Sequence, residues 1–343
     1  RQDFLSATDP RWCPGCGCYG VFKGLTSTFA NAGIPREKFA VISGIGCSSR
    51  LPYYAETYGF HSIHGRAPTV AMGVKMANPD LSVWIITGDG DALSIGGNHF
   101  MHLMRRNPDI KMILFNNQIY GLTKGQISPT SPLGKKTKTT PLGSIDTPVN
   151  PVVMALSAGA TFVARVPDND GKLMEEVFDA ARRHKGVAFI EVFLNCVIFN
   201  EGAFEPISGK DNRADNVLYL KHGESLLFGK DKNKGIVFDG VTPKVVTVGS
   251  DGFESQNIFK HDAYHASATL AFALAQLEHP DFPVPMGIFR QVAHSVYEER
   301  MKAQEEAAKE KFGTPALDDI LFSGEMWKVD ENGESHPYLR KQN

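Results

Sequence analysis

The chain has 343 residues, 42% of them hydrophobic, and a formal net charge of -2. A chain of this length can bury a substantial core in one large domain or two ordinary ones. The near-neutral charge, without a block of like charges, argues against nucleic-acid binding. No run approaches the roughly 20 apolar residues of a membrane span, and the N-terminus lacks the apolar core of a signal peptide. We therefore expect a cytoplasmic protein.

Apolar runs alternate with segments of helical periodicity between residues 20 and 195. We expect strands at 39–43, 81–87, 110–116, 161–166 and 187–195, and helices at 21–33, 98–107 and 172–184. Short buried strands that alternate with helices are typical of a doubly wound, mostly parallel α/β sheet. The stretch 125–151 contains five prolines and is expected to form a long loop over a site.

The character of the sequence changes after about residue 205. Short strand-like runs separated by turns are followed by helical segments at 267–279 and 298–311, and by a tail with scattered Pro, Gly and Trp. We therefore predict two domains: residues 1–205, which carry the site, and residues 206–343, a C-terminal extension that contributes to a subunit interface.

Four residues with metal-binding side chains follow predicted strands directly. Cys47 comes after strand 39–43, Asp89 after 81–87, Asn117 after 110–116 and Cys196 after 187–195. In open α/β sheets, ligands bind outside the carboxyl ends of the strands, where loops and helix N-termini gather. The order of elements therefore predicts that these four residues share one edge of the sheet.

The segment 88–117 begins with GDG and ends with NN. Its glycines let the backbone approach a phosphate, and the following helix directs its N-terminus at the anion. Asp89 and Asn117 offer the oxygen ligands that Mg²⁺ takes when it is held between a diphosphate and side chains. The alternative is a tight strand-to-helix turn followed by an ordinary Asn-rich turn, which does not explain oxygen ligands at two adjacent strand ends.

Three of the five cysteines lie in WCPGCGCYG, residues 12–20, where Cys13 and Cys16 form a C-x2-C pair. Such a pair alone fits half of a zinc site, half of an iron–sulfur site, a redox dithiol or half of a disulfide framework. Because a reducing cytosol disfavours structural disulfides, metal ligation is the better interpretation.

The GDG and NN pair resembles the cofactor-binding signature of thiamine diphosphate enzymes. Together with CPGCG, GIGCSS, HGR and NNQIYGLTKGQISPTS, it resembles the β subunit of 2-oxoacid:ferredoxin oxidoreductases over roughly residues 12–230. The resemblance implies that Asp89, the Asn117 side chain and the Ile119 carbonyl hold Mg²⁺, with Asn116 as the competitor of Asn117. It also implies a 4Fe-4S cluster on Cys13, Cys16, Cys47 and Cys196, and Cys18 has no counterpart. Four thiolates would also suit zinc.

Further residues match the thiamine contacts of this family, with His64 as the catalytic candidate. They are Ile45, Gly46, Cys47, Ser48, His64, Gly90, Asp91, Gly121 and Leu122. Lys124, in GLTKGQ, is a candidate partner for the distal carboxylate of a dicarboxylic substrate. A solvated loop lysine is the alternative there, and a surface histidine is the alternative for His64.

The resemblance implies reversible oxidative decarboxylation of a 2-oxoacid, most like 2-oxoglutarate to succinyl-CoA and CO₂. Coenzyme A takes the acyl group, and ferredoxin takes the electrons. Because one doubly wound unit is predicted, a separate α subunit is expected to supply the pyrimidine side of thiamine and its activating carboxylate, in an α2β2 assembly. The alternatives are a pyruvate:ferredoxin oxidoreductase subunit, a non-redox thiamine diphosphate decarboxylase component with structural zinc, and a non-enzymatic metal-binding scaffold.

Overall fold

A computed structural model describes residues 1–250 and 253–338 of the chain. Its contacts divide the chain into two compact units, Arg1–Glu298 and Glu299–Asn343. The first unit contains the central sheet and all residues predicted to form the site. Each unit is described by itself.

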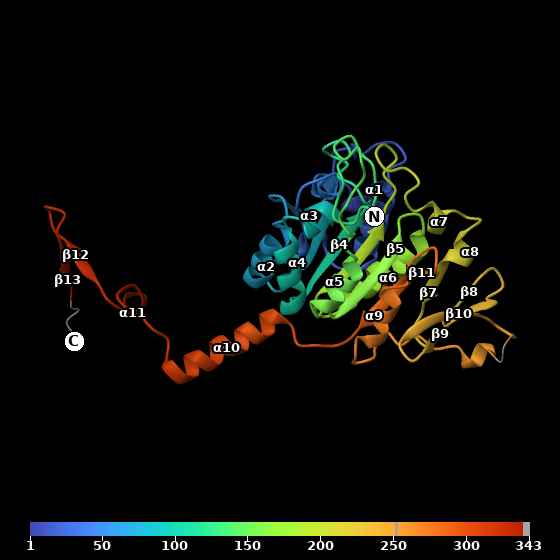
Figure 1. The fold of residues 1–343 in the computed structure, drawn as a ribbon. Coiled ribbons are helices and arrows are strands. Elements are labelled where there is room, and N and C mark those ends of the chain that lie inside the picture. Colours follow the sequence, from blue (N-terminus) through green and yellow to red (C-terminus); the bar gives the residue numbers. More distant parts are fainter. Residues whose placement is uncertain (251–252, 339–343) are drawn as a thin grey trace. The chain divides into compact units, whose positions relative to one another are not determined.

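An eight-stranded sheet forms the centre of the first unit, in the order β2-β1-β3-β4-β6-β5-β11-β7 (Figure 1). Its strands are β1 (Phe39–Ser43), β2 (Tyr58–His61), β3 (Ser82–Gly88), β4 (Ile110–Asn116), β5 (Phe162–Pro167), β6 (Ala188–Phe193), β7 (Val217–Leu220) and β11 (Val284–Gln291). Neighbouring strands are parallel except for β5 and β11, which pair antiparallel. The fold is therefore the mostly parallel α/β sheet that the alternation of elements predicts.

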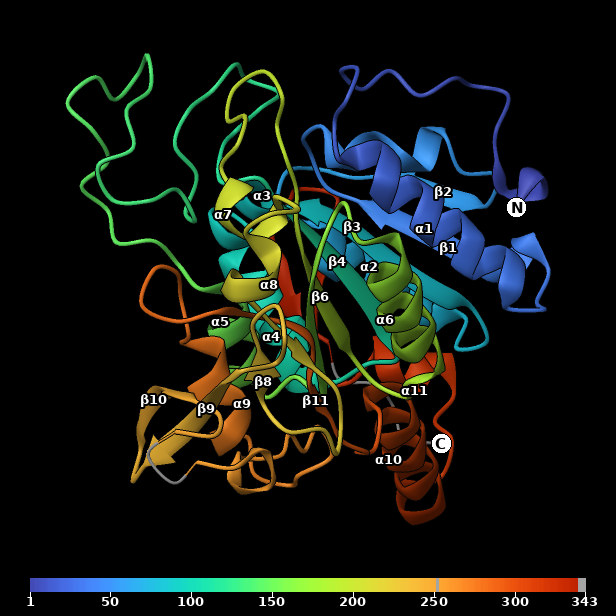
Figure 2. The ribbon, with the colours of Figure 1, turned by 90° about the vertical axis from the view of Figure 1, so that its right-hand side faces the viewer.

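Helices cover both faces of the sheet, and each face has its own hydrophobic core (Figure 2). One face packs against α1 (Cys18–Asn31) and α6 (Gly171–Arg183), and the other against α2 (Ala67–Ala77), α4 (Gly97–Arg106), α5 (Pro151–Ser157) and α9 (Thr269–Ala275). In α1, Leu25 and Phe29 lie one turn apart and are fully buried, as apolar side chains at helical spacing should be. Because helices cover the central strands on both faces, the sequences of these strands are nearly continuous apolar runs.

The remaining elements of the first unit, apart from the start of α10, are short. They are α3 (Asp89–Leu93), α7 (Glu205–Ser208), α8 (Arg213–Asn216), the 3-10 helices η1 (Gln2–Phe4), η2 (Arg36–Lys38), η3 (Ser48–Tyr53) and η4 (Ser255–Asn257), and a small antiparallel sheet of β8 (Leu227–Phe228), β9 (Lys234–Asp239) and β10 (Thr242–Thr247). Residues 117–150 form no helix and no strand longer than an isolated bridge, in agreement with the predicted loop.

The predicted domain boundary at residues 205 and 206 does not coincide with the division in the structure. β7 and β11 follow that boundary in the chain, yet they extend the main sheet beyond β5. Both lie among turns and irregular segments. A short apolar run predicts a strand, but it does not indicate which sheet that strand joins. The first unit consequently continues to Glu298.

The second unit contains most of α10 (Tyr297–Phe312), followed by α11 (Leu317–Leu321) and a hairpin of β12 (Trp327–Val329) and β13 (Ser335–Pro337). Its described part exposes several large apolar side chains, including Phe312, Leu317 and Trp327. Throughout the described residues, no helix combines the length and the apolar character that crossing a membrane requires.

Candidate functional site

The loops that follow β1, β3, β4 and β6 meet at one edge of the sheet and line a cavity of about 300 Å³. Cys47, Asp89, Asn117 and Cys196 each contribute to its wall, one from each loop. Figure 2 shows these loops and the N-terminal segment gathered at one end of the first unit. The structure therefore brings together the four residues that the order of strands predicts at one edge.

Most other predicted site residues line the same cavity. They are Cys13, Cys16, Ile45, Gly46, Ser48, His64, Gly90, Asp91, Ile119, Gly121 and Leu122. Lys124 is not among the lining residues; it is exposed and has a φ of 76°, a value that non-glycine residues seldom adopt.

Asp89 begins α3 and is buried, with a relative exposure of 3%. Its Oδ2 accepts hydrogen bonds of 2.6 Å from the hydroxyls of Ser128 and Thr130. Burial raises the pKa of this carboxyl group to about 6, while the two hydroxyl groups oppose the shift. The sequence analysis missed both hydroxyl residues, because Ser and Thr in a long polar loop carry no signal of their own.

The structure distinguishes the two asparagines of the NN pair. Asn116 is buried; its Nδ2 donates to Glu191 Oε1 at 2.7 Å, and its Oδ1 lies 2.9 Å from Thr130 Oγ1 and accepts from the Gln118 backbone. Asn117 lines the cavity, and its Oδ1 accepts one hydrogen bond, from the Ile119 N–H at 3.2 Å. An amide oxygen has two lone pairs, so Asn117 retains one for a ligand in the cavity.

Asp91 connects three segments of the site. Its Oδ1 accepts from the N–H groups of Ile45 and Gly65, at 3.1 and 2.7 Å, and lies 2.6 Å from His64 Nδ1. Its Oδ2 accepts from the Thr87 hydroxyl at 2.6 Å. A carboxylate beside Nδ1 favours the tautomer in which Nδ1 carries the proton. His64 therefore keeps Nε2 as the nitrogen that can accept a proton.

Two glycines of the cavity differ in how closely other atoms approach them. A Cβ at Gly90 would lie 2.2 Å from the ring of Tyr120, whose hydroxyl donates to the Gly90 carbonyl at 3.0 Å. A Cβ at Gly121 would lie 3.6 Å from Cys196 Sγ and 3.7 Å from Cys47 Sγ. These are ordinary van der Waals distances, so a side-chain methyl group would fit between Gly121 and the two sulfur atoms.

All five cysteines are free and line the cavity, although their burial differs. Cys13 is exposed, Cys16, Cys47 and Cys196 are partly buried, and Cys18 is fully buried. A hydrogen bond from the Cys18 thiol lowers the pKa of Cys16 to about 7. Burial, with the neighbouring sulfurs, raises the pKa of Cys47 to about 11.

Aromatic packing fixes the N-terminal cysteine loop over the sheet edge. Trp12 is buried between Tyr19, Phe22 and Tyr54, with ring centroids 4.9 to 5.8 Å apart. Its indole N–H donates to the Cys47 carbonyl at 2.7 Å. This bond ties the loop that carries Cys13 and Cys16 to the loop after β1.

These residues fit the groups that the sequence predicts. Asp89, Asn117 and Ile119 all line the cavity, and their carboxylate, amide and carbonyl groups offer the oxygen donors that Mg²⁺ prefers. Cysteine sulfurs from three separate segments lie on the same cavity, as a four-thiolate site requires. At the start of α3, Gly90 leaves the space that the Tyr120 ring occupies.

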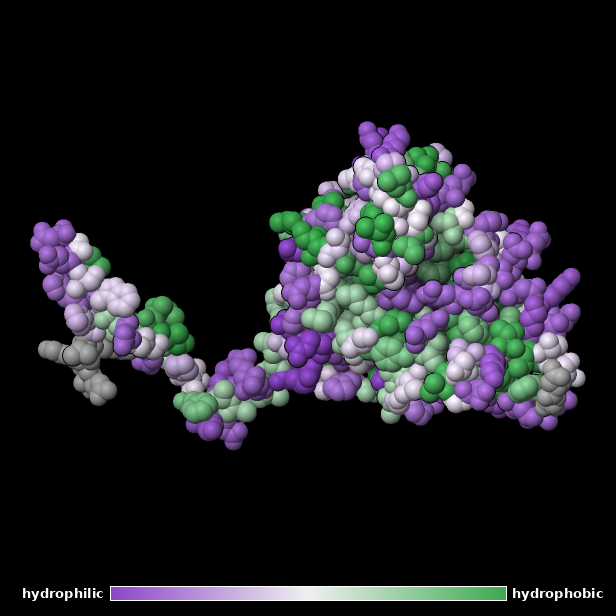
Figure 3. All heavy atoms as spheres, viewed as in Figure 1, coloured by the Kyte–Doolittle hydropathy of each residue, from purple (hydrophilic) through white to green (hydrophobic). Residues whose placement is uncertain are grey.

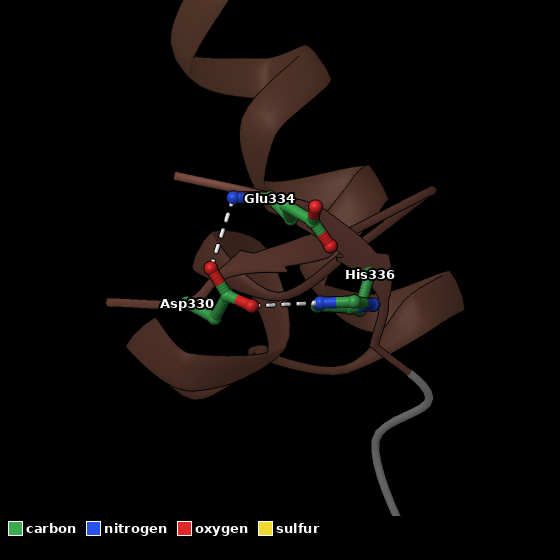
Figure 4. Close-up of side chains that lie close together, drawn as sticks. All are labelled: Asp330, Glu334 and His336. Carbon is green, nitrogen blue, oxygen red and sulfur yellow. Dashed lines mark hydrogen bonds and ion pairs between the residues drawn. The ribbon is translucent and has the colours of Figure 1, made fainter. Parts of the chain in front are cut away.

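A second group of potential metal ligands lies in the hairpin of the second unit (Figure 4). The ligand atoms of Asp330, Glu334 and His336 lie within 4.8 Å of one another. Asp330 Oδ1, however, accepts 2.9 Å hydrogen bonds from the backbone of Asn332 and Glu334, and its Oδ2 lies 3.1 Å from His336 Nε2. These hydrogen bonds stabilise the turn between β12 and β13, which explains why the three side chains lie close together.

Comparison with known proteins identifies the class of domain that forms the cavity. Residues 44–192 match the family described as thiamine pyrophosphate enzyme, C-terminal TPP binding domain. This segment includes the loops after β1, β3 and β4, so the first unit carries a thiamine diphosphate-binding domain.

Whole-chain comparisons narrow the class to a family. The chain is 46% identical over 332 residues to the 2-oxoglutarate oxidoreductase subunit KorB of Mycobacterium tuberculosis. This match covers 96% of this chain and 88% of that protein. It is 45% identical over 192 residues to a 2-oxoacid:ferredoxin oxidoreductase subunit beta of Saccharolobus solfataricus, covering 55% of this chain and 63% of that one. The chain belongs to the β-subunit family of the 2-oxoacid:ferredoxin oxidoreductases, which confirms the resemblance.

A solved structure agrees with this assignment. The 2-oxoglutarate:ferredoxin oxidoreductase of Magnetococcus marinus, with 2-oxoglutarate, coenzyme A and succinyl-CoA bound, matches with a TM-score of 0.73 and 32% identity. The match covers 94% of this chain and 95% of that one.

Proposed function

We propose that this chain is the β subunit of a 2-oxoglutarate:ferredoxin oxidoreductase. The assembled enzyme would convert 2-oxoglutarate and coenzyme A to succinyl-CoA and CO₂, reversibly, and pass the electrons to ferredoxin. The observation that carries the proposal is one cavity shared by the thiamine diphosphate edge and five cysteines. The names of the relatives support 2-oxoglutarate over pyruvate.

On the oxygen-lined wall, Asp89, the Asn117 side chain and the Ile119 carbonyl would hold Mg²⁺ against the diphosphate. Ser128 and Thr130 would fix Asp89 Oδ2 and leave the other carboxylate oxygen for the ion. Outer hydrogen bonds of this kind orient metal ligands. Gly90 would let the Tyr120 ring pack beside the start of α3, next to the cofactor.

On the sulfur-lined wall, Cys13, Cys16, Cys47 and Cys196 would hold a 4Fe-4S cluster. When bound, thiamine diphosphate supplies an electron sink for decarboxylation, and the cluster accepts electrons singly. Cys13 is the exposed member of the set, so it would be the ligand on the solvent side of the cluster.

His64 and Lys124 would serve the reacting molecules. His64, held through Nδ1 by Asp91, would accept or return a proton at Nε2 beside the cofactor. Lys124 would pair with the distal carboxylate of 2-oxoglutarate, a role that requires its loop to reach the cavity in the assembled enzyme. An exposed loop allows such a movement.

An α subunit would complete the site. Within residues 1–250 and 253–338 there is one large, mostly parallel sheet, and it would bind the diphosphate side of the cofactor. The loop 117–150 exposes Leu133, Leu142 and Ile145, and hydrophobic surface is visible at the loop end of the first unit (Figure 3). Such surface suits burial against a partner that brings the pyrimidine side and its activating carboxylate, in an α2β2 assembly.

Anaerobic purification with the partner subunit tests the proposal. We expect a brown protein with about four iron atoms per β subunit, bleached by 2-oxoglutarate plus coenzyme A and more slowly by pyruvate. The chain alone should not turn over. Asp89→Ala should lose thiamine diphosphate while retaining iron, and Cys13→Ser should do the reverse. A colourless zinc protein that binds thiamine diphosphate would instead establish the non-redox alternative.

A further inference from the structure

Asp168 lies between the two chain segments that bring cysteines to the site. It follows β5 directly, and its backbone N–H donates to the Phe193 carbonyl at the end of β6, at 2.9 Å. Its Oδ2 accepts a 2.9 Å hydrogen bond from the N–H of Asn195, the residue before Cys196. The carboxylate of Asp168 is therefore bonded to the start of the loop that carries Cys196.

The same carboxylate oxygen also lies against Gly17 in the N-terminal cysteine loop. A Cβ at Gly17 would lie 1.9 Å from Asp168 Oδ2, well below the 3.0 Å that real contacts of this kind keep. Gly17 has a φ of -58° and a ψ of -20°, angles that any residue adopts, so the lack of space, and not the backbone conformation, requires glycine here. The Gly17 N–H also donates to the Asn195 carbonyl, at 3.4 Å. Because Gly17 follows Cys16 directly, one carboxylate contacts the chain neighbours of two proposed ligands.

The first turn of α1 packs against the backbone of the same residue. A Cβ at Gly20 would lie 2.7 Å from the Asp168 carbonyl oxygen. Glycine weakens a helix, because it loses more conformational freedom on folding than any other residue. Packing explains its presence here: Gly17 and Gly20 let the helix that follows the cysteine loop lie directly against Asp168.

We propose that Asp168 is a positioning residue for the iron–sulfur cluster, which holds Cys16 and Cys196 at the separation that the cluster requires. The inference rests on the proposed function, because it requires the cluster. The two cysteines are far apart in the chain and lie in loops, so their relative position depends on contacts between those loops. Losing an outer contact that orients metal ligands lowers metal affinity by about 10- to 100-fold.

The test follows iron release from the complex assembled with its partner subunit, and it needs no turnover. Asp168→Ala removes the carboxylate, whereas Asp168→Asn retains an oxygen that can accept from the Asn195 N–H. Asp170→Ala, in the same segment, is the matched control, because Asp170 Oδ1 caps α6 by accepting from the Leu173 N–H at 3.2 Å. Iron and acid-labile sulfide are counted first, and the rate at which a chelator removes the iron is then measured without oxygen, beside the unfolding temperature.

We expect Asp168→Ala to release iron about tenfold faster than the wild type, the lower end for a lost outer contact of a metal site. Asp168→Asn should release iron at nearly the wild-type rate. Asp170→Ala should lower the unfolding temperature, because α6 loses its cap, and should keep the wild-type rate of iron release. An unchanged rate in Asp168→Ala, or an equal acceleration in Asp170→Ala, would overturn the inference.

A second variant changes the contact from its other side and leaves Asp168 in place. Gly17→Ala puts a methyl group where the carboxylate lies, and Gly73→Ala is its control, because a Cβ at Gly73 within α2 would meet nothing within 4 Å. Gly17→Ala should release iron faster than the wild type, and Gly73→Ala should not. Firm retention of iron in Gly17→Ala would exclude this contact even if Asp168→Ala failed to fold. Absence of iron from the wild-type complex would instead refute the proposed function.

Discussion

The hydroxyl group of Thr130 joins the two strand ends that carry the candidate magnesium site. Its Oγ1 lies 2.6 Å from Asp89 Oδ2 and 2.9 Å from Asn116 Oδ1, and the residue is 3% exposed. Thr130→Val keeps the shape and removes these bonds. We expect Mg²⁺-dependent binding of thiamine diphosphate, measured by calorimetry, to weaken by about tenfold, the lower end for lost outer-shell partners of a metal site.

Thr28→Val is the matched control for this substitution. Thr28 is equally buried, but its hydroxyl donates to the Gly24 carbonyl within α1. This variant should lose some stability and keep the affinity for the cofactor. Equal losses of affinity in both variants would show that Thr130 acts through general packing and not through Asp89.

The two asparagines of the NN pair should separate cofactor binding from stability. Asn117→Ala should abolish Mg²⁺-dependent cofactor binding with little change in the unfolding temperature, because its side chain faces the cavity. Asn116→Ala should lower the unfolding temperature, because Glu191 loses a buried partner and retains only Arg165, at 2.6 Å. If Asn116→Ala lost the cofactor in a stable protein and Asn117→Ala did not, Asn116 and not Asn117 would be the Mg²⁺ ligand.

At the scale of elements, the strands and helices that are easiest to predict from the sequence are those with a regular pattern of buried residues. β1 and β4 lie where their apolar runs predict them, and α4 and α6 differ from the predicted helices by one residue at each end. The central strands could be predicted because helices cover both faces and most strand positions are apolar. β7 and β11 could not be assigned to the main sheet, because strand pairing across such a distance depends on tertiary packing.

The same contrast holds for the site. Cys47 and Asp89 could be placed together from chain order alone, because parallel strands bring their carboxyl ends to one edge. Ser128 and Thr130 reach Asp89 only through the path of an irregular loop, which no periodicity describes. WCPGCGCYG shows three cysteines, but that Cys18 is fully buried while Cys13 is exposed appears only in the fold.

His184 should make the opposite end of the sheet sensitive to acid. It caps α6, is 7% exposed, and its Nε2 lies 2.8 Å from the Thr161 hydroxyl before β5. Burial, aided by Lys111, lowers the pKa of His184 to about 4. An unfolded histidine has a pKa of about 6.5, so the unfolded state binds the extra proton between these values.

Stability from this residue should therefore be complete above about pH 6.5 and fall as the pH drops towards 4, by roughly 2–3 kcal/mol in all. Unfolding curves at intervals across this range measure it. His184→Gln, which cannot titrate, should lose stability at pH 7 and show a shallower dependence below it. Parallel curves for the two proteins would exclude His184 as the acid-sensitive group.

At the scale of the whole molecule, the second unit has few means of burying its own apolar side chains. Leu317, Leu321 and Trp327 are between 62% and 69% exposed within the described residues. α10 carries charged residues around most of its surface and buries only Glu298. Large apolar side chains that remain exposed in this way are typical of surfaces that bind another protein.

We therefore expect the second unit to contribute to assembly and not to the stability of the first. Replacing Leu317, Leu321 and Trp327 together with Ser should weaken association with the partner subunit at least about a hundredfold, since burying each such side chain contributes on the order of 1–2 kcal/mol. The unfolding temperature of the first unit should stay unchanged, because its two cores contain none of these residues.

The control replaces Glu306, Glu310 and Lys328, exposed polar residues of the same unit, with Ser. Sedimentation of each variant mixed with the partner subunit measures association. Only the apolar substitutions should release free subunits at micromolar concentration, because only they remove hydrophobic area from the contact. If the polar variant dissociated equally, the unit would act through its charges, and if neither dissociated, the exposed side chains of this unit would lie outside the assembly interface.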